Sequence, residues 1–111
     1  MTNDHTKRIA ELNDLCRKAM GITGRLLQTE GINALPLLAQ SAIREKVEMF
    51  NSFTPDSDPY GEHDFGALEH EGKRIFWKID YYAPDLKHGS ENPAAPKQTV
   101  RILTIMLASE Y

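Results

Sequence analysis

The fold is decided by residues 64–82, which read DFGALEHEGKRIFWKIDYY. Strand-forming residues with a period of two lie on both sides of Glu71-Gly72, and this pattern predicts a β-hairpin. Gly72 can adopt the positive φ that a tight turn or a glycine bulge requires.

Two registers of this hairpin fit the sequence. A two-residue loop places Phe65 opposite Lys78, whereas a three-residue loop closed by a bulge places Asp64 opposite Lys78. We favour the second register, because it puts Phe65 on the face of Trp77 and so separates the apolar side chains more cleanly. In both registers Lys78 and Asp80 point away from Trp77.

Two further elements are predicted in the first third of the chain. Residues 4–20 carry apolar side chains at helical spacing, with Asn3 or Asp4 as N-cap and Gly21 as the stop. Residues 25–29 resemble a short strand between two glycines.

The remaining elements follow from the same reasoning. A second helix is predicted over residues 33–50, with Pro36 in its first turn. Residues 51–62 and 83–98 are rich in turn residues and indicate a surface loop and a surface excursion. Residues 99–109 are apolar and β-branched, which predicts a strand in the middle of the sheet and covered on both sides.

These elements predict an α+β fold: two helices packed on a three- or four-stranded, mainly antiparallel sheet, as a two-layer single domain over residues 1–111. The 111 residues are enough for one core.

Composition narrows the class of protein. A net charge of −3 gives no general attraction to phosphate, so nucleic acid is not favoured as a partner. The single cysteine, Cys16, allows neither an intrachain disulfide nor a multi-thiolate zinc site, which fits a cytoplasmic setting. The sequence contains no run of eighteen apolar residues and no signal-peptide pattern, so we predict neither membrane insertion nor export.

Charged and aromatic residues gather around the hairpin, and this is where we expect a site. Lys78 and Asp80 are the candidate catalytic residues, on one face with either His63 or the pair Glu62 and Asp64. The predicted binding residues are Tyr60, Glu62, His63, Asp64, Lys78, Asp80 and Tyr82.

A metal site is the alternative reading of the same cluster. An imidazole with two carboxylates is a common catalytic ligand set, and His63, Asp64 and Asp80 could supply it. Consecutive strand residues face opposite sides, however, so these three converge only if the strand starts after Asp64. We therefore predict no cofactor, with a divalent metal as the alternative.

Five segments carry a resemblance to a known family: residues 58–66, 77–82 and 99–111, with Leu12-Asn13-Asp14 and Gly24-Arg25. The sequences of these segments, and their order along nearly the whole chain, resemble the small bacterial proteins grouped as domain of unknown function 3768 (DUF3768). The resemblance implies short stand-alone alphaproteobacterial proteins, often carried on plasmids and mobile elements, with no assigned activity or catalytic residues.

Two functional hypotheses follow. The first is a non-enzymatic module that binds or inhibits a protein partner, in an anti-defence or regulatory role of the mobile-element type. The second is a metal-dependent hydrolase or nuclease that uses His63, Asp64 and Asp80, with Lys78 as electrostatic support. An uncovered strand edge would also allow a homodimer.

Overall fold

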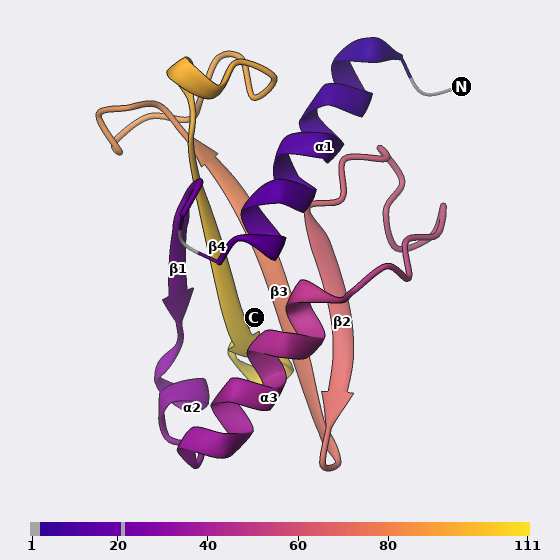
Figure 1. Cartoon of the computed structure of the whole chain (residues 1–111), viewed down its shortest axis with the longest axis vertical. Helices are drawn as coiled ribbons and strands as arrows, with labels where there is room; N and C mark the ends of the chain where they lie inside the picture. Colours follow the sequence, from indigo (N-terminus) through magenta and orange to yellow (C-terminus); the bar gives the residue numbers. More distant parts are fainter. Residues whose placement is uncertain (1–2, 21) are drawn as a thin grey trace.

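The computed structural model describes residues 3–20 and 22–111 and shows a four-stranded sheet with helices on one face (Figure 1). The strand order is β1-β4-β3-β2, with β1 parallel to β4 and the other neighbours antiparallel. The predicted α+β class is confirmed, and the sheet is mixed rather than purely antiparallel. The strands are β1 (Arg25–Gln28), β2 (Phe65–His70), β3 (Lys73–Tyr82) and β4 (Val100–Leu107).

The first helix, α1 (Asp4–Lys18), forms as predicted. The Asn3 side chain accepts a hydrogen bond from the Thr6 amide at 2.7 Å and so caps the first turn. The predicted stop at Gly21 lies outside the described residues. The buried side of α1 includes the polar residues Asn13 and Arg17 in addition to apolar ones.

The second predicted helix is divided in two, α2 (Glu30–Asn33) and α3 (Leu37–Glu48). Pro36 is the N-cap of α3 rather than a residue of its first turn, because a proline disfavours helical backbone at the residue before it. Gln40 Nε2 bridges the break by donating to the carbonyls of Asn33 and Leu35, at 3.1 and 2.8 Å.

The hairpin uses the two-residue loop, so the register that the sequence favoured is wrong. Glu71 and Gly72 both have positive φ, 49° and 79°, as a type I′ turn requires. Phe65 therefore lies opposite Lys78, and Gly66 lies opposite Trp77.

Packing around Trp77 explains this register. A Cβ built on Gly66 would collide with the indole ring of Trp77, so only glycine fits beneath it. Trp77 is fully buried and faces the helices, and this places Phe65 on the opposite face of the sheet.

The last strand, β4, lies in the middle of the sheet as predicted, but it is not covered on both sides. Arg101, Leu103 and Ile105 are buried toward the helices. On the other face Ile102 and Thr104 are half-buried, and only Met106 near the end of the strand is buried. The core on the helix side consists of Cys16, Ile32, Ile43, Val47, Ile75, Trp77, Ile79, Leu103 and Ile105.

Residues 51–62 and 83–98 lie outside the named strands and α-helices, as predicted, apart from a 3₁₀ turn, η1 (Pro96–Gln98), and an isolated β-bridge between Gly89 and Tyr82. A second 3₁₀ turn, η2 (Ala108–Glu110), follows β4. Among the described residues, no helix is both long and apolar enough to cross a bilayer.

Replacing Gly66 tests the packing that sets the register. We expect Gly66→Ala to lower the free energy of unfolding by about 1–3 kcal/mol, because the added methyl group meets the Trp77 ring. Gly89→Ala is the matched control, since a Cβ there meets its nearest atom at 3.9 Å. Urea unfolding of both variants measures the difference, and equal losses would contradict the explanation.

Candidate functional site

The sheet face opposite the helices, called the helix-free face below, carries the predicted pair Lys78 and Asp80. Strand side chains alternate between faces, and Trp77 and Ile79 face the helices. From the strand registers, the helix-free face consists of Arg25, Leu27, Phe65, Ala67, Glu69, Arg74, Phe76, Lys78, Asp80, Tyr82, Val100, Ile102, Thr104 and Met106, of which Met106 is buried.

Lys78 and Asp80 form an ion pair on this face, with Lys78 Nζ 2.7 Å from Asp80 Oδ2. The hydrogen bond to Asp80 is the main reason that the pKa of Lys78 is raised, and burial opposes it. Each side chain is 39% exposed, so the pair contributes at most about 1 kcal/mol to stability. Thr104 and Ile102 lie beside the pair on β4.

Three aromatic rings pack together at the β2 side of the helix-free face. The ring centroids of Phe65 and Phe76 are 5.2 Å apart, and Tyr111 lies 5.9 and 5.6 Å from them. The Arg74 guanidinium lies 5.6 Å from the Phe76 ring centroid. Because Tyr111 contacts both rings, the residues after β4 turn back across this face. Tyr111 is 76% exposed and so presents an aromatic surface there.

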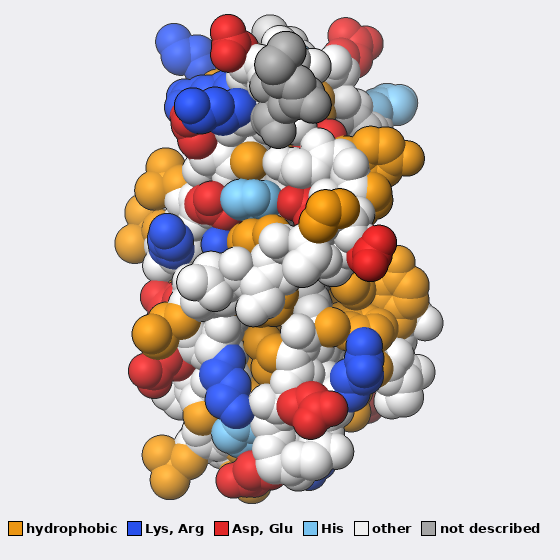
Figure 2. Space-filling model, turned by 90° about the vertical axis from the view of Figure 1, so that its right-hand side faces the viewer, with side chains coloured by type: hydrophobic (Ala, Val, Ile, Leu, Met, Phe, Trp, Pro, Cys, Tyr) orange, Lys and Arg blue, Asp and Glu red, His pale blue; other side chains and the backbone are white. Residues whose placement is uncertain are grey.

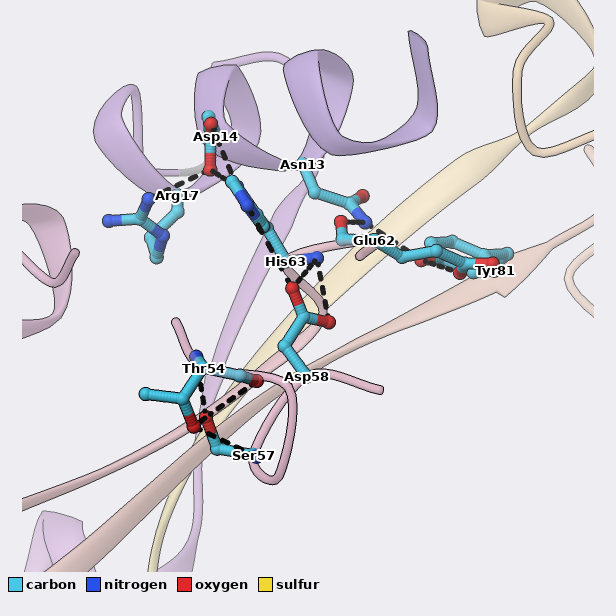
Figure 3. A network of polar contacts seen from close by, with 9 residues as sticks. All are labelled: Asn13, Asp14, Arg17, Thr54, Ser57, Asp58, Glu62, His63 and Tyr81. Atoms are coloured by element: carbon cyan, nitrogen blue, oxygen red, sulfur yellow. Dashed lines mark hydrogen bonds and ion pairs between the residues drawn. The ribbon is translucent and has the colours of Figure 1, made fainter. Parts of the chain in front are cut away.

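His63 lies on the other side of the sheet, against α1 (Figure 3). Its backbone has a φ of 58°, which ends the extended chain before β2 begins at Phe65. Its ring stacks on Phe53 with centroids 3.9 Å apart, and its Nδ1 lies 3.0 Å from Asp14 Oδ1. The contact with α1 thus draws His63 away from Lys78 and Asp80.

The same carboxylate, Asp14, holds the buried Arg17 at 2.9 Å. Arg17 Nη1 also donates to the carbonyls of Val47 and Glu48, at 2.9 and 2.8 Å, at the C-terminal end of α3. A cation there is favourable because helix C-terminal carbonyls carry partial negative charge. Its guanidinium lies 5.3 Å from the Trp77 ring centroid. Arg17 therefore joins α1, α3 and the sheet.

A second chain of hydrogen bonds runs through Tyr81. Its hydroxyl accepts from Asn13 Nδ2 at 2.7 Å and donates to Glu62 Oε1 at 2.8 Å (Figure 3). Asn13 Oδ1 in turn accepts from Arg101 Nε at 2.7 Å. Burial raises the pKa of Tyr81 well above its ordinary value, and the bond to Glu62 adds to the rise while the Asn13 donor opposes it. The Glu62 carboxylate is thus hydrogen-bonded within the fold.

The 51–62 loop closes on His63 and leaves a hollow of about 370 Å³. Asp58, whose side chain is only 5% exposed, accepts from the His63 amide at 3.2 Å. Phe53 and the 81% exposed Tyr60 also line the hollow. On this side of the molecule, acidic side chains flank a histidine at the surface (Figure 2). Asp58 is therefore a carboxylate that holds the loop in place.

The structure divides the predicted binding residues instead of gathering them. Lys78, Asp80 and Tyr82 lie on the helix-free face, whereas Tyr60 and His63 border the hollow. The prediction that His63, or Glu62 with Asp64, shares a face with Lys78 and Asp80 is wrong, because the strand begins only at Phe65 and the turn at His63 interrupts strand alternation.

The candidate metal ligands are likewise not assembled. His63 faces α1 while Asp80 faces away from the helices, so they lie on opposite sides of the sheet. Within residues 3–20 and 22–111, no group of three or more His, Cys, Asp or Glu side chains is placed to hold a metal ion. The pKa of Asp64 is raised, first by burial and then by the negative charge of Glu62.

Several residues of these networks were not anticipated from the sequence. Asn13, Asp14 and Arg17 bind the loop and the sheet, and Tyr111 completes the aromatic group. The available signal was Asn13 and Arg17 within the apolar stripe of α1, because buried polar side chains require partners elsewhere in the fold.

Comparisons with known proteins agree with the resemblance noted in the sequence. Residues 28–110 match the family model described as "Protein of unknown function (DUF3768)". No curated protein and no solved structure matches the chain.

Two adjacent tyrosines test the polar network. We expect Tyr81→Phe to lower the free energy of unfolding by about 1–3 kcal/mol, because it leaves partners of its hydroxyl unpaired. Tyr82→Phe is the control, since the described residues offer its hydroxyl no hydrogen bond, and it should change stability by less than about 0.5 kcal/mol. Equal effects in chemical denaturation would refute the role given to Tyr81.

Proposed function

The chain belongs to the DUF3768 family, and because that membership assigns no activity, we propose its role from its geometry. It is a non-enzymatic module that docks a folded protein partner on the helix-free face. The role is inhibitory or regulatory and cytoplasmic, and carriage on bacterial mobile elements would fit an anti-defence protein of this kind.

One observation carries the proposal: the sheet has helices on one side only (Figure 1). Its other side carries apolar side chains around the ion pair of Lys78 with Asp80. Phe76, Ile102 and Leu27 form the apolar part, and Arg25 and Arg74 lie among the charged residues around it. An apolar centre with aromatic anchors and a charged rim is the usual arrangement of a protein interface.

The same geometry argues against catalysis at Lys78 and Asp80. Enzyme sites are concave and exclude water, which strengthens the electrostatic interactions that catalysis uses. Lys78 and Asp80 instead lie on a sheet face, each 39% exposed, and neutralise one another. The proposal therefore includes no cofactor.

The partner that fits this face is a protein with an apolar patch and a slightly acidic rim. Arg25, Arg74 and Lys78 outnumber Glu69 and Asp80 on the face, so its charge is mildly positive. Nucleic acid is not favoured, because the net charge is −3 and the Tyr111 ring packs edge-on against Phe65 and Phe76.

Site-specific photocrosslinking in the bacterial host tests the proposal. A photoreactive residue at Ile102 should crosslink a defined partner, whereas the same residue at Leu38, which is 86% exposed on α3, should not. With the identified partner, Ile102→Glu should weaken binding by about tenfold or more, because a charge would be desolvated, and Leu38→Glu should leave it unchanged. Crosslinks from Leu38 alone, or equal effects of the two substitutions, would overturn the proposed face.

The alternative function, a metal-dependent hydrolase or nuclease using His63, Asp64 and Asp80, has its own test. A ligand that binds only the native state must raise the melting temperature. Because His63 and Asp80 lie on opposite sides of the sheet, we expect no shift with manganese, magnesium or zinc. A shift that His63→Ala and Asp80→Ala both abolish would favour the hydrolase over the binding module.

A further inference from the structure

The two edges of the sheet are protected differently. Along β2, the Lys46 ammonium donates to the Glu69 carbonyl at 2.9 Å and lies 3.2 Å from His70 Nδ1. A lysine over an edge strand discourages pairing with another chain. The edge formed by β1 carries Leu26 and Leu27, and Leu27 is 52% exposed.

The outward main-chain groups of β1 are available for pairing. The Thr29 amide donates to the Ile105 carbonyl, so alternate residues of this segment bond to β4 and Leu26 and Gln28 point outward. The Gln28 carbonyl accepts from Asn33 Nδ2 at 3.3 Å. Within the part of the chain that the structure describes, nothing pairs with the amide and carbonyl of Leu26.

A groove adjoins this edge on the helix side. It has a volume of about 940 Å³ and lies between β1, the end of α1 and α3. Its apolar lining comes from Met20, Leu26 and Met49, and Met49 is 73% exposed. Its charged lining is balanced: Lys18, Arg44, Glu45 and Glu48.

We infer that a second copy of this chain pairs with this edge. The two β1 strands are antiparallel and are related by a two-fold axis that passes beside Leu26. Leu26 and its counterpart then exchange two main-chain hydrogen bonds, since both have a free amide and carbonyl. Arg25 of one copy lies opposite Leu27 of the other. Two four-stranded sheets become one continuous sheet, and the two helix-free faces become one larger face.

Three features favour a second copy over a flexible peptide as the occupant. A four-residue edge offers few hydrogen bonds, and a peptide would lose conformational entropy at every residue that it orders, whereas a folded copy brings an ordered strand. A two-fold interface brings the same surface of both copies together, and the groove beside the edge has two basic and two acidic side chains, so it carries no net charge that would repel a second copy. Pairing also brings Arg25 of the second copy beside Leu27, which is 52% exposed in the single chain.

Sedimentation equilibrium of the purified full chain over a range of concentrations tests this dimer. The wild-type chain, 12.6 kDa, should reach twice that mass. Leu27→Lys should raise the dimer dissociation constant about tenfold, because it places like charges opposite Arg25 of the other copy, twice by symmetry. Leu27→Glu should retain the dimer, and Arg25→Glu combined with Leu27→Lys should restore it.

The control is Ala67→Lys, which adds the same charge to the helix-free face at the opposite edge and should leave the dimer intact. Circular dichroism verifies that each variant is folded. A monomer at every concentration, or a dimer that Leu27→Lys does not weaken, overturns the inference. The dimer does not depend on the proposed partner, so the photocrosslinking result and the sedimentation result can fail separately.

Discussion

The structure depends on one close contact, the Trp77 indole packed over Gly66. A tryptophan fills this space only opposite a residue without a Cβ, so the contact fixes the register of β2 against β3. Because side chains alternate along a strand, the register decides that Trp77 and Ile79 enter the core and that Lys78 and Asp80 face away from it. Shifting the register by one residue would put Phe65 toward the helices and leave no room for the indole.

Buried polar side chains fix how the helices and the 51–62 loop lie on the sheet. Arg17 connects α1 to the carbonyls at the end of α3 and lies over Trp77, while Asn13 connects α1 to Tyr81 and Arg101. Such groups are costly to bury unless their hydrogen bonds are made, so each one specifies where its partners must lie. The network orders the helices and the 51–62 loop on one side of the sheet, and the other side is the one that we propose docks a partner.

The sequence predicts the elements better than the contacts between them. The helix after Asn3, the short strand at Arg25 and the central position of β4 all follow from local patterns. The register does not, because the pattern around Glu71-Gly72 fits two loops and only the space above Gly66 distinguishes them. The candidate site shows the same limit: Lys78 and Asp80 meet because they are two residues apart on a strand, whereas His63 bonds to Asp14, 49 residues away.

The register is therefore the claim to measure, by nuclear Overhauser effects between Hα protons across the hairpin. The bond from the Ile79 amide to the Asp64 carbonyl makes Phe65 and Lys78 a non-hydrogen-bonded pair, in which the Cα atoms are only about 4.5 Å apart. We predict strong Hα–Hα effects between Phe65 and Lys78 and between Ala67 and Phe76. An effect between Asp64 and Lys78 in their place would show the bulged register and would contradict the assignment of Lys78 and Asp80 to a face shared with Phe65.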